Sequence, residues 1–287
     1  MAMRIALTLS TLRAAIGAYP ETAALLEGRV GSDLLALDNI RHTPPSKAFP
    51  AMVRQSAFEV SEMAIATFLM AKAYGKPMVL LPVVLAERAQ ESALLTAIDG
   101  PVRGPADLSG AHIAVRAYSQ TTGMWLRGSL AEFHGIRADA QRWTTFEDAH
   151  VPEFMDPPWV TRGTAAQDLL AMTRSGEAAA GIFGNDLPTG LRTVFPDPEA
   201  AGAQFRDRHG FIPVNHLVVV RRDVADARPE LLVELMRMLA ASGARMHTRE
   251  TLRPALALAI RYCTEQGMMP RPLSVEEAWE GLPAAIP

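Results

Sequence analysis

The segment 112–136 constrains the fold of this chain most, because it combines a buried strand, a polar turn and a helix. Residues 113–115 are apolar and predict the strand, and the turn 119–123 leads into the helix. The first N–H groups of a helix have no intrahelical partner, and the helix dipole adds partial positive charge there. The turn therefore predicts a site for a small anion, although such residues can equally serve only to cap the helix. The residues expected to contact the ligand here are Ser119, Gln120, Thr121 and Thr122.

Strands and helices alternate along the rest of the chain, which predicts parallel α/β sheets. The first strand is expected at 5–9, followed by a helical piece at 11–17. A Gly- and Pro-rich segment at 99–107 predicts a boundary between two lobes, and an apolar strand within 211–222 predicts a return to the first lobe. We therefore expect a two-lobed α/β fold in which the second lobe is inserted into the first. Lobe 1 comprises residues 1–100 and 207–287, lobe 2 comprises residues 101–206, and the ligand lies between them.

Polar turns that follow the expected strands are further candidate binding positions. In open α/β sheets, ligands bind beyond the carboxyl ends of the strands. Besides the turn at 119–123, the side chains expected at such positions are Ser10, Thr11, Ser61, Glu62 and Asn185.

The composition excludes several classes of function. The chain of 287 residues has a net charge of −3 and no basic run, so we expect no nucleic-acid partner. A single cysteine, Cys263, excludes an internal disulfide and a Cys-based metal cluster. No P-loop, dinucleotide fingerprint, nucleophile elbow or HExxH motif occurs, and the histidines have no metal-ligand spacing. We expect no cofactor and no metal, while a metal assembled from residues distant in sequence stays open.

The N-terminal residues predict the compartment. Their apolar run is interrupted by Thr8 and Ser10, whereas a signal peptide has a longer apolar region and a small-residue cleavage site. No apolar run approaches the roughly 20 residues of a membrane span. We expect a cytoplasmic protein without membrane insertion, or a periplasmic one if a leader has been removed. A homo-oligomer stays open.

Four stretches carry a recognisable pattern: FEVSEMAIATFL at 58–69, DLSGAHIAVRAYSQTTGMWLRG at 107–128, VFPDP at 194–198 and GFIPVNHLVVVRRDV at 210–224. Together they resemble the 4,5-dihydroxyphthalate decarboxylase family. That family has the type II periplasmic-binding-protein fold, which it shares with the solute-binding proteins of ABC transporters. The resemblance implies this fold and one of two functions. The first is decarboxylation of a small hydroxylated aromatic carboxylic acid, and the second is non-catalytic binding of a small organic anion, with a transporter as partner.

The chain also departs from the family pattern. The residues that match it around the polar turn are Tyr118, Thr121, Trp125, Arg127 and Gly128. Ala117 stands where the family has Glu. Arg88 is kept from the family's Ser-Arg-x-x-Arg-His stretch, but the second Arg and the His are replaced. Both histidines of the family's His-His-Glu-Gln-Gly stretch are absent from residues 263–267.

Decarboxylation of an aromatic acid requires groups that hold the carboxylates and an acid that protonates the ring carbon as carbon dioxide leaves. His216, with Asn215 beside it on an expected strand, is our candidate for the acid, although a histidine at a lobe hinge can be purely structural. Arg54, Arg88 and Arg127 are the candidates for holding carboxylates.

Three of the candidate residues have a structural alternative. Arg127 can project from the outer face of its helix into solvent instead of reaching a ligand. Trp125 can stack on an aromatic ligand or pack in the core. Glu62 can orient a ligand hydroxyl or an arginine, or it can merely complement a helix dipole.

Overall fold

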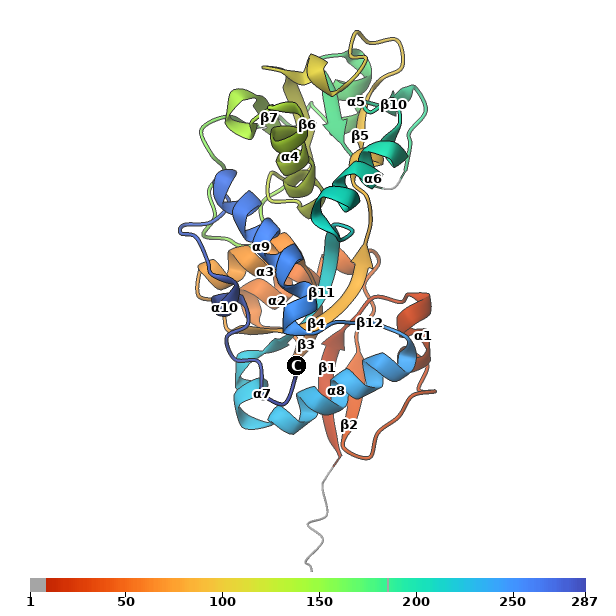
Figure 1. The fold of residues 1–287 in the computed structure, drawn as a ribbon, viewed down its shortest axis with the longest axis vertical. Helices are drawn as coiled ribbons and strands as arrows, with labels where there is room; N and C mark the ends of the chain where they lie inside the picture. Colours follow the sequence, from red (N-terminus) through yellow and green to blue (C-terminus); the bar gives the residue numbers. More distant parts are fainter. Residues whose placement is uncertain (1–8, 185) are drawn as a thin grey trace, which may run out of the picture.

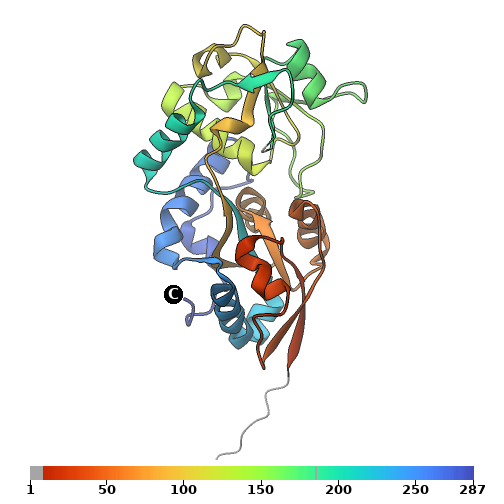
Figure 2. The same ribbon diagram turned by 90° about the vertical axis from the view of Figure 1, so that its right-hand side faces the viewer.

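The computed structural model describes residues 9–184 and 186–287, whose strands form two six-stranded sheets (Figure 1). The first sheet contains β1 (Ser10–Ala15), β2 (Leu35–Asn39), β3 (Val60–Ala64), β4 (Met78–Glu87), β11 (Val214–Arg221) and β12 (Arg245–Met246), in the order β12-β4-β11-β3-β1-β2. The second contains β5 (Leu94–Ala97), β6 (His112–Val115), β7 (Arg142–Thr145), β8 (Val160–Arg162), β9 (Ala180–Ile182) and β10 (Leu191–Thr193), in the order β10-β5-β9-β6-β7-β8. Figure 2 shows the two sheets one above the other along the long axis.

The chain leaves the first sheet after β4 and returns to it with β11, so the expected two-lobed fold with an inserted second lobe is confirmed. The prediction of parallel sheets is only partly correct. β1 pairs in parallel with β2 and β3, whereas β11 runs antiparallel to both β3 and β4. The reason is that β11 begins at the end of the sheet where β4 finishes, so the two strands run in opposite directions. β5 already pairs in the second sheet, so the chain changes sheets before residue 100.

Helices cover the faces of both sheets. They are α1 (Pro20–Leu26), α2 (Phe49–Gln55), α3 (Ile65–Ala73), α4 (Thr121–His134), α5 (Leu169–Ser175), α6 (Pro198–His209), α7 (Arg222–Ala227), α8 (Pro229–Ser242), α9 (Arg249–Glu265) and α10 (Val275–Ala278). In the described ranges, none of them is both long and apolar enough to cross a membrane.

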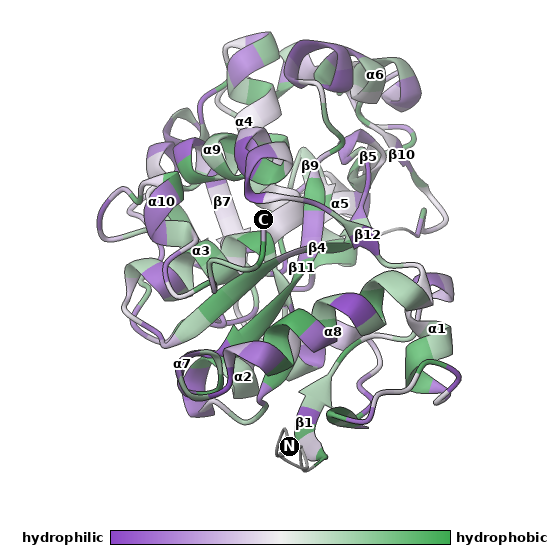
Figure 3. Cartoon of the chain, turned by 60° about the horizontal axis from the view of Figure 1, so that its bottom comes forward, coloured by the Kyte–Doolittle hydropathy of each residue, from purple (hydrophilic) through white to green (hydrophobic). Residues whose placement is uncertain are grey.

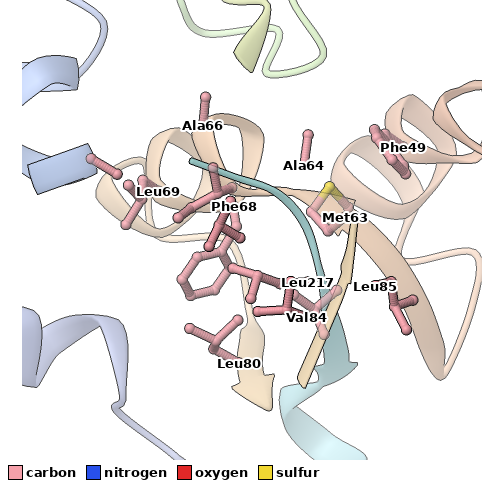
Figure 4. Packing of buried hydrophobic residues seen from close by; sticks show 14 of the residues in the cluster. Phe49, Met63, Ala64, Ala66, Phe68, Leu69, Leu80, Val84, Leu85 and Leu217 are labelled. Atoms are coloured by element: carbon pink, nitrogen blue, oxygen red, sulfur yellow. The ribbon is translucent and has the colours of Figure 1, made fainter. Parts of the chain in front are cut away.

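The central strands of the first sheet are apolar because both of their faces are covered. Residues 78–85 of β4 and residues 217–220 of β11 are buried, and both strands are coloured as hydrophobic in Figure 3. Val84 and Leu217 are partners in the register of the two strands and lie side by side in Figure 4. The two segments that join the sheets continue from this pair of strands, one after β4 and the other before β11.

The prediction at the N-terminus is wrong in one respect. The strand expected at 5–9 falls outside the described residues apart from Leu9, and the helical piece expected at 11–17 is largely a strand, β1. Leu12 and Ala14 are buried while their neighbours Thr11 and Arg13 are exposed, which is the two-residue period of a strand. Pairing with β2 and β3 outweighs the helix propensity of the local sequence.

Helix α9 packs against α3 of the first lobe and α4 of the second (Figure 1). Gly128 of α4 makes this approach possible, because a Cβ atom there would lie 2.1 Å from the ring of Tyr262. Gln266, which follows α9, accepts a hydrogen bond from Arg127 Nε at 2.7 Å and donates one to the Met124 carbonyl at 2.8 Å. The C-terminal segment is therefore bound directly to the inserted lobe.

The Gly128–Tyr262 contact leads to a prediction for stability. Gly128→Ala forces a buried ring to move, which costs more than the roughly 1 kcal/mol that alanine gains in a helix, so we expect a net loss of about 2 kcal/mol. Thermal unfolding measures the change. Gly31→Ala is the control, because no atom lies within 4 Å of a Cβ built at Gly31. Equal melting temperatures for the two variants would contradict the prediction.

Candidate functional site

A cavity of about 390 Å³ lies between the two sheets. It is lined from the first sheet's side by residues of β11 and by residues that follow β1, β2, β3 and β4, and from the second sheet's side by residues that follow β6 and β7. The lining side chains used below are Tyr19, Phe49, Thr67, Arg88, Arg116, Ser119, Gln120, Thr121, Thr122, Glu147, His150, Asn215 and His216.

A buried carboxylate positions His216 at the wall of the cavity. Glu62 on β3 faces Val218 of the neighbouring strand β11, and His216 lies two residues away on the same face. His216 Nδ1 is 2.5 Å from Glu62 Oε1, and the Glu62 side chain is fully buried. Because Nδ1 is bound to the carboxylate, Nε2 is the ring nitrogen left for a ligand. Within the described residues, the hydrogen bond found for this ring is the one between Nδ1 and Glu62.

Two further donors hold the Glu62 carboxylate. The Tyr19 hydroxyl donates to Oε1 at 2.6 Å, and the Gly17 N–H donates to Oε2 at 2.8 Å. Burial and the neighbouring Glu62 charge raise the pKa of Tyr19, so its hydroxyl stays protonated and donates. A Cβ atom at Gly17 would lie 2.6 Å from Glu62 Oε2, which is why glycine is required in this turn. A buried carboxylate with three donors is compensated for its loss of water and has a fixed orientation.

The turn before α4 lies at the cavity as the sequence predicts. Ser119, Gln120, Thr121 and Thr122 all line it, and the Gln120 side chain does not cap the helix. Thr121 Oγ1 accepts a hydrogen bond from the Ala66 N–H at 3.3 Å, so the first turns of α3 and α4 meet here. The free amides of α4 suit an anionic group.

Arg88 adds a positive charge beside these amides. Its Nη2 donates to Thr122 Oγ1 at 3.2 Å, and burial lowers its pKa without removing the charge of a guanidinium. Asn215 also lines the cavity, and its Oδ1 accepts a hydrogen bond from Gln90 Nε2 at 2.8 Å. That bond leaves the Asn215 amide nitrogen as a donor for a ligand.

His150, which the sequence did not single out, approaches the cavity on the loop after β7. Its Nδ1 is 2.9 Å from Thr67 Oγ1, and its ring meets Phe49 edge to face with the centroids 5.7 Å apart. The His216 ring meets the same Phe49 at 5.3 Å. Burial, together with the nearby charges of Arg116 and Arg54, lowers the pKa of His150 to about 4. This imidazole is therefore neutral near pH 7.

Several residues expected at the ligand lie elsewhere. Ser10 and Thr11 begin β1 and so lie at its amino end, where Ser10 accepts a hydrogen bond from Arg228 at 3.1 Å. Ser61 is buried in β3 and donates to the Glu62 carbonyl. Arg54 donates to the carbonyl groups of residues 149 and 150. Asn185 lies outside the described residues.

Trp125 and Arg127 are buried on the sides of α4 that face away from the cavity. Trp125 donates from Nε1 to the Val214 carbonyl at 2.8 Å. Arg127 is only 1% exposed, so the expectation that it could reach solvent is wrong, and its guanidinium lies 3.9 Å from the centre of the Tyr118 ring. Both residues hold α4 in place and do not line the cavity.

Sequence reasoning missed Tyr19, Phe49, Thr67, Arg116, Glu147 and His150 among the lining residues. Tyr19 follows the true end of β1, and the misassigned helix at 11–17 concealed that position. Within the described residues, no group of three or more His, Cys, Asp or Glu side chains is placed to hold a metal ion.

Comparison with known proteins supports the resemblance seen in the sequence. No family model matches the chain. A protein from Comamonas testosteroni named 4,5-dihydroxyphthalate decarboxylase is 25% identical over 284 residues, which cover 93% of this chain and 85% of that protein. One of the same name from Pseudomonas putida is 27% identical over 134 residues, which cover 46% of this chain and 51% of that protein. The chain is similar to these proteins at the level of a family.

Solved structures show the fold. The periplasmic aliphatic sulphonate binding protein SsuA from Escherichia coli has a TM-score of 0.54 at 14% identity, covering 96% of this chain and 84% of that one. The alkanesulfonate-binding protein SsuA from Xanthomonas axonopodis pv. citri, bound to MOPS, has a TM-score of 0.53 at 16% identity. The match covers 95% of this chain and 84% of that one. The expected type II periplasmic-binding-protein fold is therefore confirmed.

Proposed function

We propose, from the premise that this chain resembles the 4,5-dihydroxyphthalate decarboxylases, that it decarboxylates a small hydroxylated aromatic carboxylic acid. The observation that carries the proposal is the buried Glu62–His216 pair, which presents Nε2 of an oriented imidazole at a cavity suited to an anion. A binding protein needs the anion-binding groups alone, whereas the oriented histidine is what a proton transfer requires.

The reaction follows from these positions. The amides at the start of α4 and the Arg88 guanidinium hold the carboxylates of the acid. His216, protonated and paired with Glu62, gives the proton on Nε2 to the ring carbon that carries one carboxylate. The bond from that carbon to the carboxylate then breaks, carbon dioxide leaves, and the electron pair of the broken bond restores the aromatic ring. His216 regains a proton from water.

Non-catalytic binding of a small organic anion is the second candidate. It is favoured by the similarity of the fold to sulphonate-binding proteins, whose ligands are also anionic. The two candidates share the anionic ligand and differ in whether the ligand is changed.

Incubation with 4,5-dihydroxyphthalate, with the release of carbon dioxide measured, tests the proposal. We expect release with the wild-type protein, and thermal shift on the same samples reports binding. The acid incubated without protein is the control for spontaneous decarboxylation. A rise in melting temperature without any carbon dioxide would overturn the decarboxylase and support the binding protein, and no response in either measurement would exclude 4,5-dihydroxyphthalate as the ligand.

A further inference from the structure

We infer that His150 is a second ligand-contacting residue, whose Nε2 forms a hydrogen bond with a ring hydroxyl of the bound acid. This inference rests on the proposed function and deepens it, because it names the group that distinguishes a hydroxylated acid from its unhydroxylated analogue. It gives the second lobe a part in selecting the ligand.

The position of His150 is fixed by contacts with the first lobe. Thr67 of α3 holds its Nδ1 at 2.9 Å, and Phe49 of α2 packs against its ring. Arg54 of α2 donates to the Ala149 carbonyl at 2.7 Å and to the carbonyl of His150 itself at 3.1 Å. Further along the loop, Lys76 and Glu153 form an ion pair at 2.5 Å. The loop is thus attached to the first lobe on both sides of the imidazole, and protein contacts alone place the ring at the cavity.

The free ring nitrogen of His150 makes it a hydrogen-bonding group for the ligand. The hydrogen bond found for this ring within the described part of the chain joins Nδ1 to Thr67, which leaves Nε2 for the ligand. Burial and the nearby positive charges of Arg116 and Arg54 lower the pKa of His150, so the ring is neutral. His150 therefore adds hydrogen-bonding capacity to the cavity without adding charge.

A neutral imidazole suits a hydroxyl better than a carboxylate. The bond to Thr67 is compatible with either tautomer, so Nε2 either donates or accepts. A hydroxyl can do both and pairs with each tautomer, whereas a carboxylate only accepts and pairs with one of them. The carboxylates already have the α4 amides and Arg88, which leaves the hydroxyl as the group that requires a partner.

The same contact would assist the proposed reaction. A ring hydroxyl that donates to Nε2 releases more electron density into the aromatic ring. Higher electron density favours protonation of the ring carbon by His216 Nε2, and no other proton is consumed or released at His150. His150 is therefore expected to affect both ligand affinity and turnover.

Binding of 4,5-dihydroxyphthalate and of phthalate, which lacks the hydroxyls, tests the inference by titration calorimetry. We expect His150→Ala to weaken binding of 4,5-dihydroxyphthalate by about tenfold, the usual effect of one hydrogen bond, and to leave phthalate binding unchanged. His150→Gln replaces the imidazole by an amide that can also donate or accept a hydrogen bond, and should restore most of the affinity. His134→Ala is the control, because His134 ends α4 and does not line the cavity.

Equal weakening for the two acids, or no weakening for either, would overturn the inference, and so would a wild-type protein that binds neither. The outcome is separable from that of the decarboxylase proposal. A wild-type protein that releases no carbon dioxide refutes the proposed reaction, yet a selective loss of 4,5-dihydroxyphthalate binding in His150→Ala would still establish the contact.

Discussion

Replacement of His216 by Ala is expected to lower the rate of carbon dioxide release by a factor of about 10² to 10⁴, the range for loss of a general acid. The variant removes the only group that the proposed reaction uses to protonate the ring. Ligand affinity should change little, because the carboxylates are held by Arg88 and the α4 amides. Turnover at saturating 4,5-dihydroxyphthalate and calorimetric affinity are measured on the same preparation.

His216→Asn separates chemistry from structure. The Asn amide nitrogen can replace Nδ1 as the donor to Glu62, but it cannot deliver a proton to a carbon atom. We expect the same loss of turnover with a melting temperature close to that of the wild type. Turnover within about tenfold of the wild-type rate in either variant would show that His216 is not the acid.

Replacement of Glu62 by Gln is expected to lower turnover by about 10²-fold and to destabilise the fold by about 1–3 kcal/mol. The buried carboxylate accepts from His216, Tyr19 and Gly17, and the Gln amide nitrogen must face at least one of these donors. The protonated His216 also loses its negatively charged partner. Turnover and unfolding in urea measure the two effects.

Tyr19→Phe is the matched control for Glu62→Gln. It removes one donor from the same carboxylate and leaves the Glu62–His216 contact in place. We expect its turnover to fall much less than that of Glu62→Gln. Equal losses in the two variants would mean that Glu62 acts by shaping the turn at Gly17 and Tyr19 rather than by orienting His216.

The sequence predicts the inserted lobe and the anion-binding turn because both depend on local patterns. A Gly- and Pro-rich segment indicates the boundary between the lobes. A strand followed by a helix whose first residues carry hydroxyl groups indicates the anion-binding turn. The Glu62–His216 pair is different, because 154 positions separate the two residues. Their contact depends on the register between β3 and β11, which the residues on either strand do not determine separately.

The arginines show a second limit of sequence reasoning. Arg54, Arg88 and Arg127 are equivalent as residue types, yet one holds a loop, one lines the cavity and one is buried in the core. The role of Arg127 depends on the side of α4 on which it lies. The role of Arg88 depends on the path of the chain after β4. His150 escaped notice for a related reason: its loop has no periodic pattern, and contacts with α2 and α3 fix its place.

The attachment of α9 to both lobes bears on the thermodynamics of ligand binding. Rotation of the second lobe away from the first would pull Gln266 from Arg127 and Met124 and expose a guanidinium that is now buried. These bonds join protein groups only, so they stabilise this arrangement of the two lobes independently of a ligand. Contacts of this kind preorganise the cavity and reduce the entropy that ligand binding must offset.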